Sequence, residues 1–270
     1  MGTRETGNRR VVGFDVLPLT TSPFPHVVRD GYLEPDLLSE LQTSFPSCPW
    51  DATSTRFSLY PDDAAYQDLV ASSPAWSALH TAFHSQAFVD WAQEQFADAL
   101  AGSGFKARPG TLRYVDHLES RPDKESFQPA APSADRTEVF VRMDLHQGRV
   151  GYQLPVHVDR ARRLVAMLLY LSDPREVAME GGELRLHRAF RGRGSRDPVV
   201  VEPLANRMVA FPCTSRSWHS VSEITAADRS RDYLQVRISS RAPLWSRPLS
   251  RERVRHSLTR RPPFASPSPR

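Results

Sequence analysis

Residues 151–159 have the sequence GYQLPVHVD, the most informative stretch of the chain. We expect a β-strand here, in which residues two positions apart point to the same face of a sheet. His157 and Asp159 then share one face, together with Gln153 and Pro155. The other face is apolar and consists of Tyr152, Leu154, Val156 and Val158. A polar His-x-Asp pair therefore projects from the side of the strand that does not pack.

Short runs rich in Val, Leu, Tyr and Phe surround this stretch and alternate with turn signals. They predict strands near 111–117, 138–146, 151–159, 164–171, 182–188, 198–203, 207–212, 217–224 and 231–239. Many short strands at this spacing are typical of a sandwich, a barrel or a jelly roll. Helical spacing of apolar residues predicts a helix from Pro35 and a helical region over about 74–101. We expect an α+β protein whose helical N-terminal half packs on one β core.

The composition is that of an ordinary globular protein, because 40% of the 270 residues are hydrophobic and 24% are charged. It excludes a chain that is disordered throughout and a fibrous repeat. No apolar run approaches the ~18 residues of a membrane span, and residues 1–10 lack the apolar segment of a secretory signal. Two cysteines are too few for a disulfide framework or a cysteine metal cluster. We expect a cytoplasmic protein without a membrane partner.

The net charge is +4, and all but two of the 35 basic residues are arginine. A basic patch can attract nucleic acid or acidic substrates. No nucleic-acid-binding motif accompanies the charge, so a solvated basic surface is the favoured interpretation. A nucleic-acid partner is therefore not expected.

The domain organisation follows from composition along the chain. The stretch 119–136 contains three prolines and is interpreted as a long loop, either disordered or a lid over a site. The sequence leaves the oligomeric state open. The expected parts are a flexible arm (1–12), a single domain (13–245) with a helical part (about 30–105) and a β core (about 108–240), and a basic, disordered tail (246–270).

The His-x-Asp pair supplies two corners of a possible metal site, and a third ligand must come from elsewhere. His219 is the natural candidate, because it lies in another predicted strand, SWHSV at 217–221. Two imidazoles and one carboxylate on one face leave three positions open on an octahedral ion, the arrangement of non-haem Fe(II) oxygenases. The alternatives are that His219 is a satisfied histidine near a tryptophan and that His157 is a surface residue paired with Asp159.

Several segments carry a family resemblance through their order and spacing. They are GYQLPVHVD (151–159), LLYLS (168–172), EGGEL (180–184), VAFP (209–212) and WHSV (218–221), followed by Arg231. From about Arg142 to Arg237 the chain resembles the iron(II)- and 2-oxoglutarate-dependent dioxygenases, most closely the prolyl-4-hydroxylase-like branch. This part is about a third of the chain, and the N-terminal half resembles the family only loosely.

The resemblance implies a double-stranded β-helix, or jelly roll, and a catalytic Fe(II) held by His157, Asp159 and His219. It also implies that 2-oxoglutarate and O2 are consumed, with ascorbate as an optional reductant. A basic residue on the last core strand grips the distal carboxylate of 2-oxoglutarate. Arg231 fits that position best, and a guanidinium suits it because it forms two parallel bonds with a carboxylate.

Two other residues bear on the 2-oxoglutarate site. Arg229 has the same strand parity as Arg231, and the spacing from His219 to Arg231 is longer than in the family, so Arg229 is the main rival. Tyr170 lies where the family often places a hydroxyl near 2-oxoglutarate; the alternative is a core tyrosine with a satisfied hydroxyl.

Candidate substrate-binding residues are Arg142, Asp144, Gln153 and Arg237. Arg237 stands where related enzymes often have an aromatic residue, and an arginine facing the lumen could recognise an anionic substrate group. The polar face that contains Arg142 and Asp144 either lines the cavity mouth or is the solvated side of an edge strand. The segment HLE at 117–119 imitates the metal motif and is interpreted as a structural or surface pair.

The implied reaction is hydroxylation of an unactivated C–H bond, with succinate and CO2 as co-products. Asp159 argues against a halogenase, in which this carboxylate is replaced. We expect a small metabolite as substrate, such as an amino acid or a natural-product intermediate, and prolyl hydroxylation of a protein is the alternative. Desaturation or cyclisation stays open, as do two other classes: a non-catalytic jelly-roll binding module and a nucleic-acid-binding protein.

Overall fold

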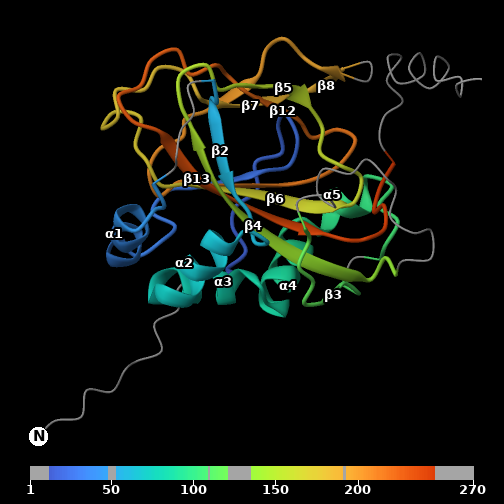
Figure 1. Cartoon of the computed structure of the whole chain (residues 1–270). Coiled ribbons are helices and arrows are strands. Elements are labelled where there is room, and N and C mark those ends of the chain that lie inside the picture. Colours follow the sequence, from blue (N-terminus) through green and yellow to red (C-terminus); the bar gives the residue numbers. More distant parts are fainter. Residues whose placement is uncertain (1–11, 48–52, 109, 121–134, 191–192, 247–270) are drawn as a thin grey trace, which may run out of the picture.

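The computed structural model describes residues 12–47, 53–108, 110–120, 135–190 and 193–246 (Figure 1). The arm expected at 1–12 and the tail expected at 246–270 lie almost entirely outside these residues, as does most of the 119–136 loop. No helix in the described part is long and apolar enough to span a bilayer.

Two antiparallel sheets face each other and form the β core (Figure 1). The smaller sheet lies above the larger one in this view, and the ring of His219 from the smaller sheet contacts Phe211 of the larger sheet. This arrangement is the predicted jelly-roll core. The larger sheet has the order β1 (Val27–Arg29), β11 (Met208–Pro212), β6 (Arg163–Tyr170), β13 (Arg231–Ser239), β4 (Glu138–Gly148) and β2 (Arg56–Leu59), with β3 (Arg113–Tyr114) pairing in parallel with β4. The smaller sheet has the order β10 (Val199–Val201), β7 (Leu184–His187), β12 (Trp218–Val221) and β5 (Leu154–His157), and β8 (Ala189–Phe190) pairs with β9 (Arg193–Gly194).

Helices from the N-terminal half cover the larger sheet on the side away from the smaller one (Figure 1). The expected helical region at 74–101 is three helices, because Ser73 and Ser85 each cap a new start by accepting a backbone N–H. The helix at 64–72 was not predicted. The helices are α1 (Pro35–Thr43), α2 (Ala64–Ser72), α3 (Pro74–Phe83), α4 (Gln86–Gln95) and α5 (Ala97–Ala101).

One continuous apolar cluster joins the helices to the outer face of the larger sheet. Phe83 and Phe88 meet edge to face at 5.0 Å between ring centroids, and Phe88 stacks on Trp91 at 5.6 Å. Burying each such side chain contributes about 1.5–3 kcal/mol, so this layer supplies much of the stability. Alternate residues of β4 and β13 face it; they are Val139, Val141, Met143, Leu145, Leu234, Val236 and Ile238.

The other face of β4 carries polar residues and is also buried. Phe140, Arg142, Asp144 and His146 are each at most 2% exposed. The interpretation of this face as the solvated side of an edge strand is therefore wrong, because β4 has β13 on one side and β2 and β3 on the other. Charged groups in such a position need partners close by.

The strand at 151–159 is shorter than expected. It covers only Leu154–His157 and forms the edge of the smaller sheet. Tyr152 and Val158 are buried, but Val156 is 44% exposed, so the expected apolar face does not pack as a unit. Its neighbour β12 has an irregular register between His219 and Val221, which limits the regular ladder.

Candidate metal centre

Strands β5 and β12 place the two candidate histidines opposite each other. His219 is the register partner of His157, and their ring centroids are 4.3 Å apart. Asp159 lies two residues beyond the end of β5 and is buried. Ligand atoms of these three residues all lie within 4.8 Å of one another, which makes them the one group of its kind among the described His, Cys, Asp and Glu residues.

Both imidazoles are oriented by a backbone carbonyl two residues earlier in the chain. Nδ1 of His157 lies 2.8 Å from the carbonyl oxygen of Pro155, and Nδ1 of His219 lies 2.9 Å from that of Ser217. A carbonyl only accepts, so each Nδ1 donates and carries the proton. In the neutral ring the lone pair is then on Nε2, which is the nitrogen available to a metal.

The Asp159 carboxylate is held on both oxygens. Arg163 donates to Oδ1, and the Cys213 thiol donates to Oδ2 at 3.3 Å. Burial acts to raise the pKa of Asp159, but the Arg163 guanidinium and the two imidazoles outweigh it and hold the pKa well below its ordinary value. The carboxylate is therefore ionised at neutral pH, as a metal ligand must be.

The donor set fits a ferrous ion. Burial and the neighbouring His157 lower the pKa of His219 to about 4, so this imidazole is neutral near pH 7. Two imidazoles and one carboxylate offer three donors, which leaves positions for two further ligands and O2. His157, Asp159 and His219 could therefore hold Fe(II) at the inner face of the smaller sheet.

Arg231 is buried without a counter-charge in the described part of the chain. It is 1% exposed, and none of its three guanidinium nitrogens makes a hydrogen bond of normal geometry there. The guanidinium carbon lies 4.9 Å from the ring centre of Tyr170 and 4.5 Å from that of Tyr233. The Tyr170 hydroxyl is also buried and makes no hydrogen bond of normal geometry among the described residues, while the hydroxyls of Tyr152 and Tyr233 bond to each other at 3.0 Å. We call the group of Arg231, Tyr170 and Tyr233 the tyrosine cradle. It suits a carboxylate, which would satisfy both the guanidinium and the Tyr170 hydroxyl.

A glycine pair makes room for Arg231. Gly182 has φ +77°, and a Cβ there would lie 3.3 Å from Cδ of Arg231. Gly181 has φ +82°, and a Cβ there would lie only 1.8 Å from the carbonyl oxygen of Glu223. Both positions therefore require glycine for conformation and for close approach.

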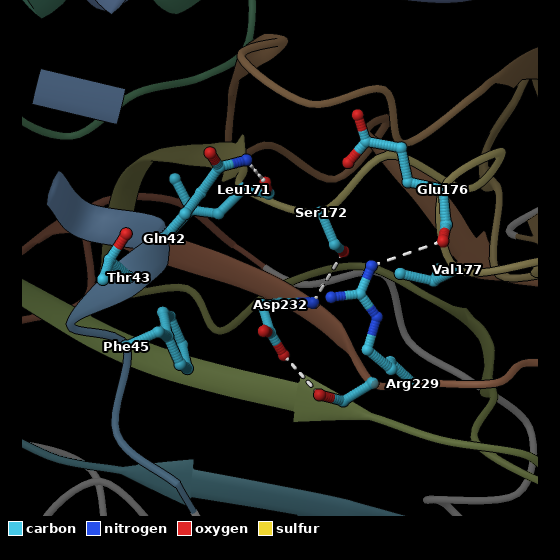
Figure 2. A pocket seen from close by; sticks show the side chains of 10 residues that line it. Gln42, Thr43, Phe45, Leu171, Ser172, Glu176, Val177, Arg229 and Asp232 are labelled. Atoms are coloured by element: carbon cyan, nitrogen blue, oxygen red, sulfur yellow. Dashed lines mark hydrogen bonds between the residues drawn. The ribbon is translucent and has the colours of Figure 1, made fainter. Parts of the chain in front are cut away.

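Arg229 is on the outside of the core. It lines a cavity of about 540 Å³ together with residues of α1 and donates to the carbonyl oxygen of Glu176 at 3.3 Å (Figure 2). The same cavity contains Asp232, whose side chain points away from that of Tyr233 along the strand. Arg229 therefore does not reach the tyrosine cradle, although its strand parity is that of Arg231.

Three of the four candidate substrate residues fall on one face, and one does not. Arg142 and Arg237 are register partners, and both bind the Asp144 carboxylate. Gln153 is an exposed residue before β5 and is not among the groups that contact this cluster.

Sequence reasoning missed two residues of this interior. Glu119, in the segment interpreted as a structural or surface pair, is buried and pairs with Arg142 and Arg162. Arg163 pairs with Asp159. The i, i+4 spacing of Arg163 from Asp159 was a signal, whereas nothing in the sequence connects Glu119 to Arg142.

Comparison with known proteins places the site in a family. Residues 118–239 match the family model of the 2OG-Fe(II) oxygenase superfamily. Similar solved structures include a Pseudomonas putida prolyl-4-hydroxylase (16% identity, 80% of this chain and 92% of that chain covered, TM-score 0.45). Another is a 2OG-Fe(II) oxygenase family oxidoreductase from Burkholderia pseudomallei (14% identity, 83% and 88% covered, TM-score 0.48). A third is the non-haem α-ketoglutarate-dependent epimerase SnoN of nogalamycin biosynthesis (14% identity, 80% and 77% covered, TM-score 0.45).

No curated protein matches the sequence. The matched segment 118–239 contains the His-Asp-His group and Arg231, and it confirms the superfamily predicted from the sequence. Through this segment the chain is similar to the 2OG-Fe(II) oxygenase superfamily, a class of oxidoreductases that use Fe(II), 2-oxoglutarate and O2.

Proposed function

We propose that the protein hydroxylates an unactivated C–H bond of a small metabolite in a reaction dependent on Fe(II) and 2-oxoglutarate. In this proposal His157, Asp159 and His219 hold the iron, and Arg231 binds the distal carboxylate of 2-oxoglutarate. The observation that carries it is the convergence of the buried Asp159 and His219 with the half-buried His157, each with its donor atom fixed by a second contact. Bound iron, 2-oxoglutarate and O2 would supply the oxidising chemistry, in which one oxygen atom enters the substrate and the other enters succinate as 2-oxoglutarate loses CO2.

The residues of the chain contribute orientation and charge. His157 and His219 present Nε2 because each Nδ1–H is engaged by a backbone carbonyl. Arg163 keeps the Asp159 carboxylate ionised and fixes its rotation. Such second contacts to metal ligands typically change metal affinity or activity 10–100-fold.

In this proposal the tyrosine cradle around Arg231 binds the distal carboxylate of 2-oxoglutarate. Arg231 gains a counter-charge when the distal carboxylate binds, and Tyr170 donates its hydroxyl to the same group. Because both polar groups are buried and unsatisfied without it, the ligand is bound in one orientation. The buried rings of Tyr170 and Tyr233 keep water from competing for the guanidinium.

The proposal is tested by succinate formation from 2-oxoglutarate with anaerobically added Fe(II) and air. The assay has one arm with free amino acids and small acids, and one arm with proline-containing peptides. We expect the small molecules to stimulate turnover and His219→Ala to abolish it, with His117→Ala as the control histidine variant. Stimulation by peptides alone would replace the metabolite with a prolyl substrate.

Metal binding gives an independent measurement. Titration with Mn(II) should show one site in the wild type and in His117→Ala, and at least hundredfold weaker binding in His219→Ala. Unchanged Mn(II) affinity in His219→Ala would remove the metal assignment.

A further inference from the structure

A row of register partners connects the candidate iron site to a pair of arginines. Phe211 pairs with Ala166, Ala166 with Arg237, and Arg237 with Arg142. Residues directly opposite each other on adjacent strands point to the same face, so all four face the smaller sheet. The ring of Phe211 lies 4.9 Å from that of His219. Arg237 and Arg142 therefore belong to the wall that faces the candidate metal ligands.

The row sets the distance between the metal ligands and the arginines. Neighbouring strands are about 4.8 Å apart, so the backbone of Arg237 lies roughly 10 Å from that of Phe211. The residue between them is Ala166, whose side chain is a single methyl group. A small molecule held at Arg237 can therefore place a carbon near the iron.

The arginine pair is only partly satisfied by the protein. Asp144 accepts from Nε of Arg142 at 2.6 Å and from Nη2 of Arg237. Arg142 also donates to the Glu119 backbone, and the Glu119 carboxylate is shared with Arg162. Nε of Arg237 has no hydrogen-bond partner among the described residues, and neither has Nη2 of Arg142, which lies 4.0 Å from Oδ1 of Asp62.

Buried N–H groups of this kind are almost always satisfied in native proteins. Burial and the adjacent Arg142 lower the pKa of Arg237, and an anion beside the two guanidinium groups would offset the cost of burying their charges. A planar carboxylate fits two guanidinium groups, because each can donate in the plane of its fork.

We propose that Arg237 and Arg142, positioned by Asp144, bind a carboxylate of the substrate across from the iron site. The inference rests on the proposed function, because it assigns the substrate class for that same site. The substrates are then small carboxylic acids, and the free amino acids among them would use this group. A purely structural ion cluster, by contrast, would be indifferent to the charge of an added molecule.

The test uses the full-length enzyme loaded under argon with Fe(II) and saturating 2-oxoglutarate, so that Arg231 is already occupied. Binding of added molecules is followed by the change in the visible absorption band of the Fe(II)–2-oxoglutarate complex. The probes are matched pairs: benzoate and benzamide, L-leucine and L-leucinamide, L-proline and L-prolinamide. We expect at least one acid to bind tenfold or more tightly than its amide.

The variants assign this preference to the residues. Arg237→Gln should lower the ratio of acid affinity to amide affinity at least tenfold. Arg185→Gln should leave this ratio unchanged, because Arg185 is an exposed arginine on the smaller sheet. Arg237→Lys keeps the charge without the planar fork and should weaken the preference severalfold; it decides the matter if Arg237→Gln does not fold. A complex that forms the band but binds acids and amides equally, or binds none of the six probes, overturns the inference. Absence of the band itself counts against the proposed function instead.

Discussion

Arg231 and Arg237 lie on the same face of β13, six residues apart, and their buried charges are handled in opposite ways. Arg237 shares the Asp144 carboxylate with Arg142. Arg231 has only aromatic rings around it in the described part of the chain, at 4.5 and 4.9 Å. A buried charge that the protein neutralises serves the fold first, whereas one that it leaves open requires a ligand.

This difference locates the two ligands of the proposed reaction. The open charge of Arg231 suits 2-oxoglutarate, which brings its own carboxylate to every turnover. The partly compensated pair at Arg237 suits a substrate, because a few unsatisfied N–H groups can discriminate between molecules without requiring an ion to keep the fold intact. The comparison predicts that the two ends respond differently to mutation.

The largest effect is expected from removing the internal counter-charge. Asp144→Ala leaves Arg142 and Arg237 buried without their shared carboxylate and should lower the free energy of unfolding by roughly 3–5 kcal/mol. Chemical denaturation followed by tryptophan fluorescence measures this. Gln235→Ala, which changes the register partner of Asp144 without changing charge, is the matched control and should cost less than half as much. Equal effects would mean that Asp144 does not compensate the pair.

At the other end, the described part of the chain has no counter-charge for Arg231 to lose. Arg231→Ala should raise the dissociation constant of 2-oxoglutarate at least tenfold, which corresponds to about 1.4 kcal/mol or more. Its effect on unfolding should be smaller than that of Asp144→Ala, because an unpaired buried charge is removed. Isothermal titration and denaturation of the same variant provide both numbers.

Arg229→Ala is the control for this position, since Arg229 has the same parity but lines the outer cavity (Figure 2). It should leave 2-oxoglutarate binding unchanged. If Arg229→Ala weakens binding and Arg231→Ala does not, Arg229 binds the distal carboxylate of 2-oxoglutarate and Arg231 does not.

Periodicity was sufficient for the β core but not for the short elements. All nine expected strands occur, because each has an alternating or continuous apolar run. Strands β1 and β2 and the β8–β9 pair were not predicted, although strands of similar length such as β3 and β10 were. The helix α2 was also not predicted, because its apolar residues form only a weakly amphipathic pattern.

For the site, the alternation of residues along a strand predicted which side chains share a face, but not which residues of other strands they contact. It placed His157 and Asp159 together, and the predicted strand at 217–221 offered His219 as the third ligand, which the structure brings into register with His157. It could not separate Arg231 from Arg229, because the strand begins at Arg231 and only the fold shows that. It also could not show that the polar face of β4 is buried, since that depends on strands distant in the sequence.

A third group, His84 on the helical side of the larger sheet, is half-buried and avoids carrying a charge because it loses its proton. His84 is partly covered, and its ring stacks on that of His80 at 3.7 Å. Burial, together with the neighbouring His80, lowers the pKa of His84 to about 4. The folded protein therefore keeps this imidazole neutral at pH values where the unfolded chain, with a pKa near 6.5, protonates it.

The smallest expected effect follows from this linkage. Between pH 6.5 and 4 the unfolded state binds the extra proton, so the contribution of His84 to stability is complete above the unfolded pKa and is lost as the pH falls. From about pH 7.5 to 5.5 the wild type should lose roughly 1 kcal/mol more stability than His84→Gln. Gln67 and His84 line one cavity beside α2 and α3, and Gln67→Ala, which removes no titratable group, should keep the wild-type slope. Parallel pH profiles for wild type and His84→Gln would show that folding does not lower the pKa of His84, and burial would then not keep this imidazole neutral.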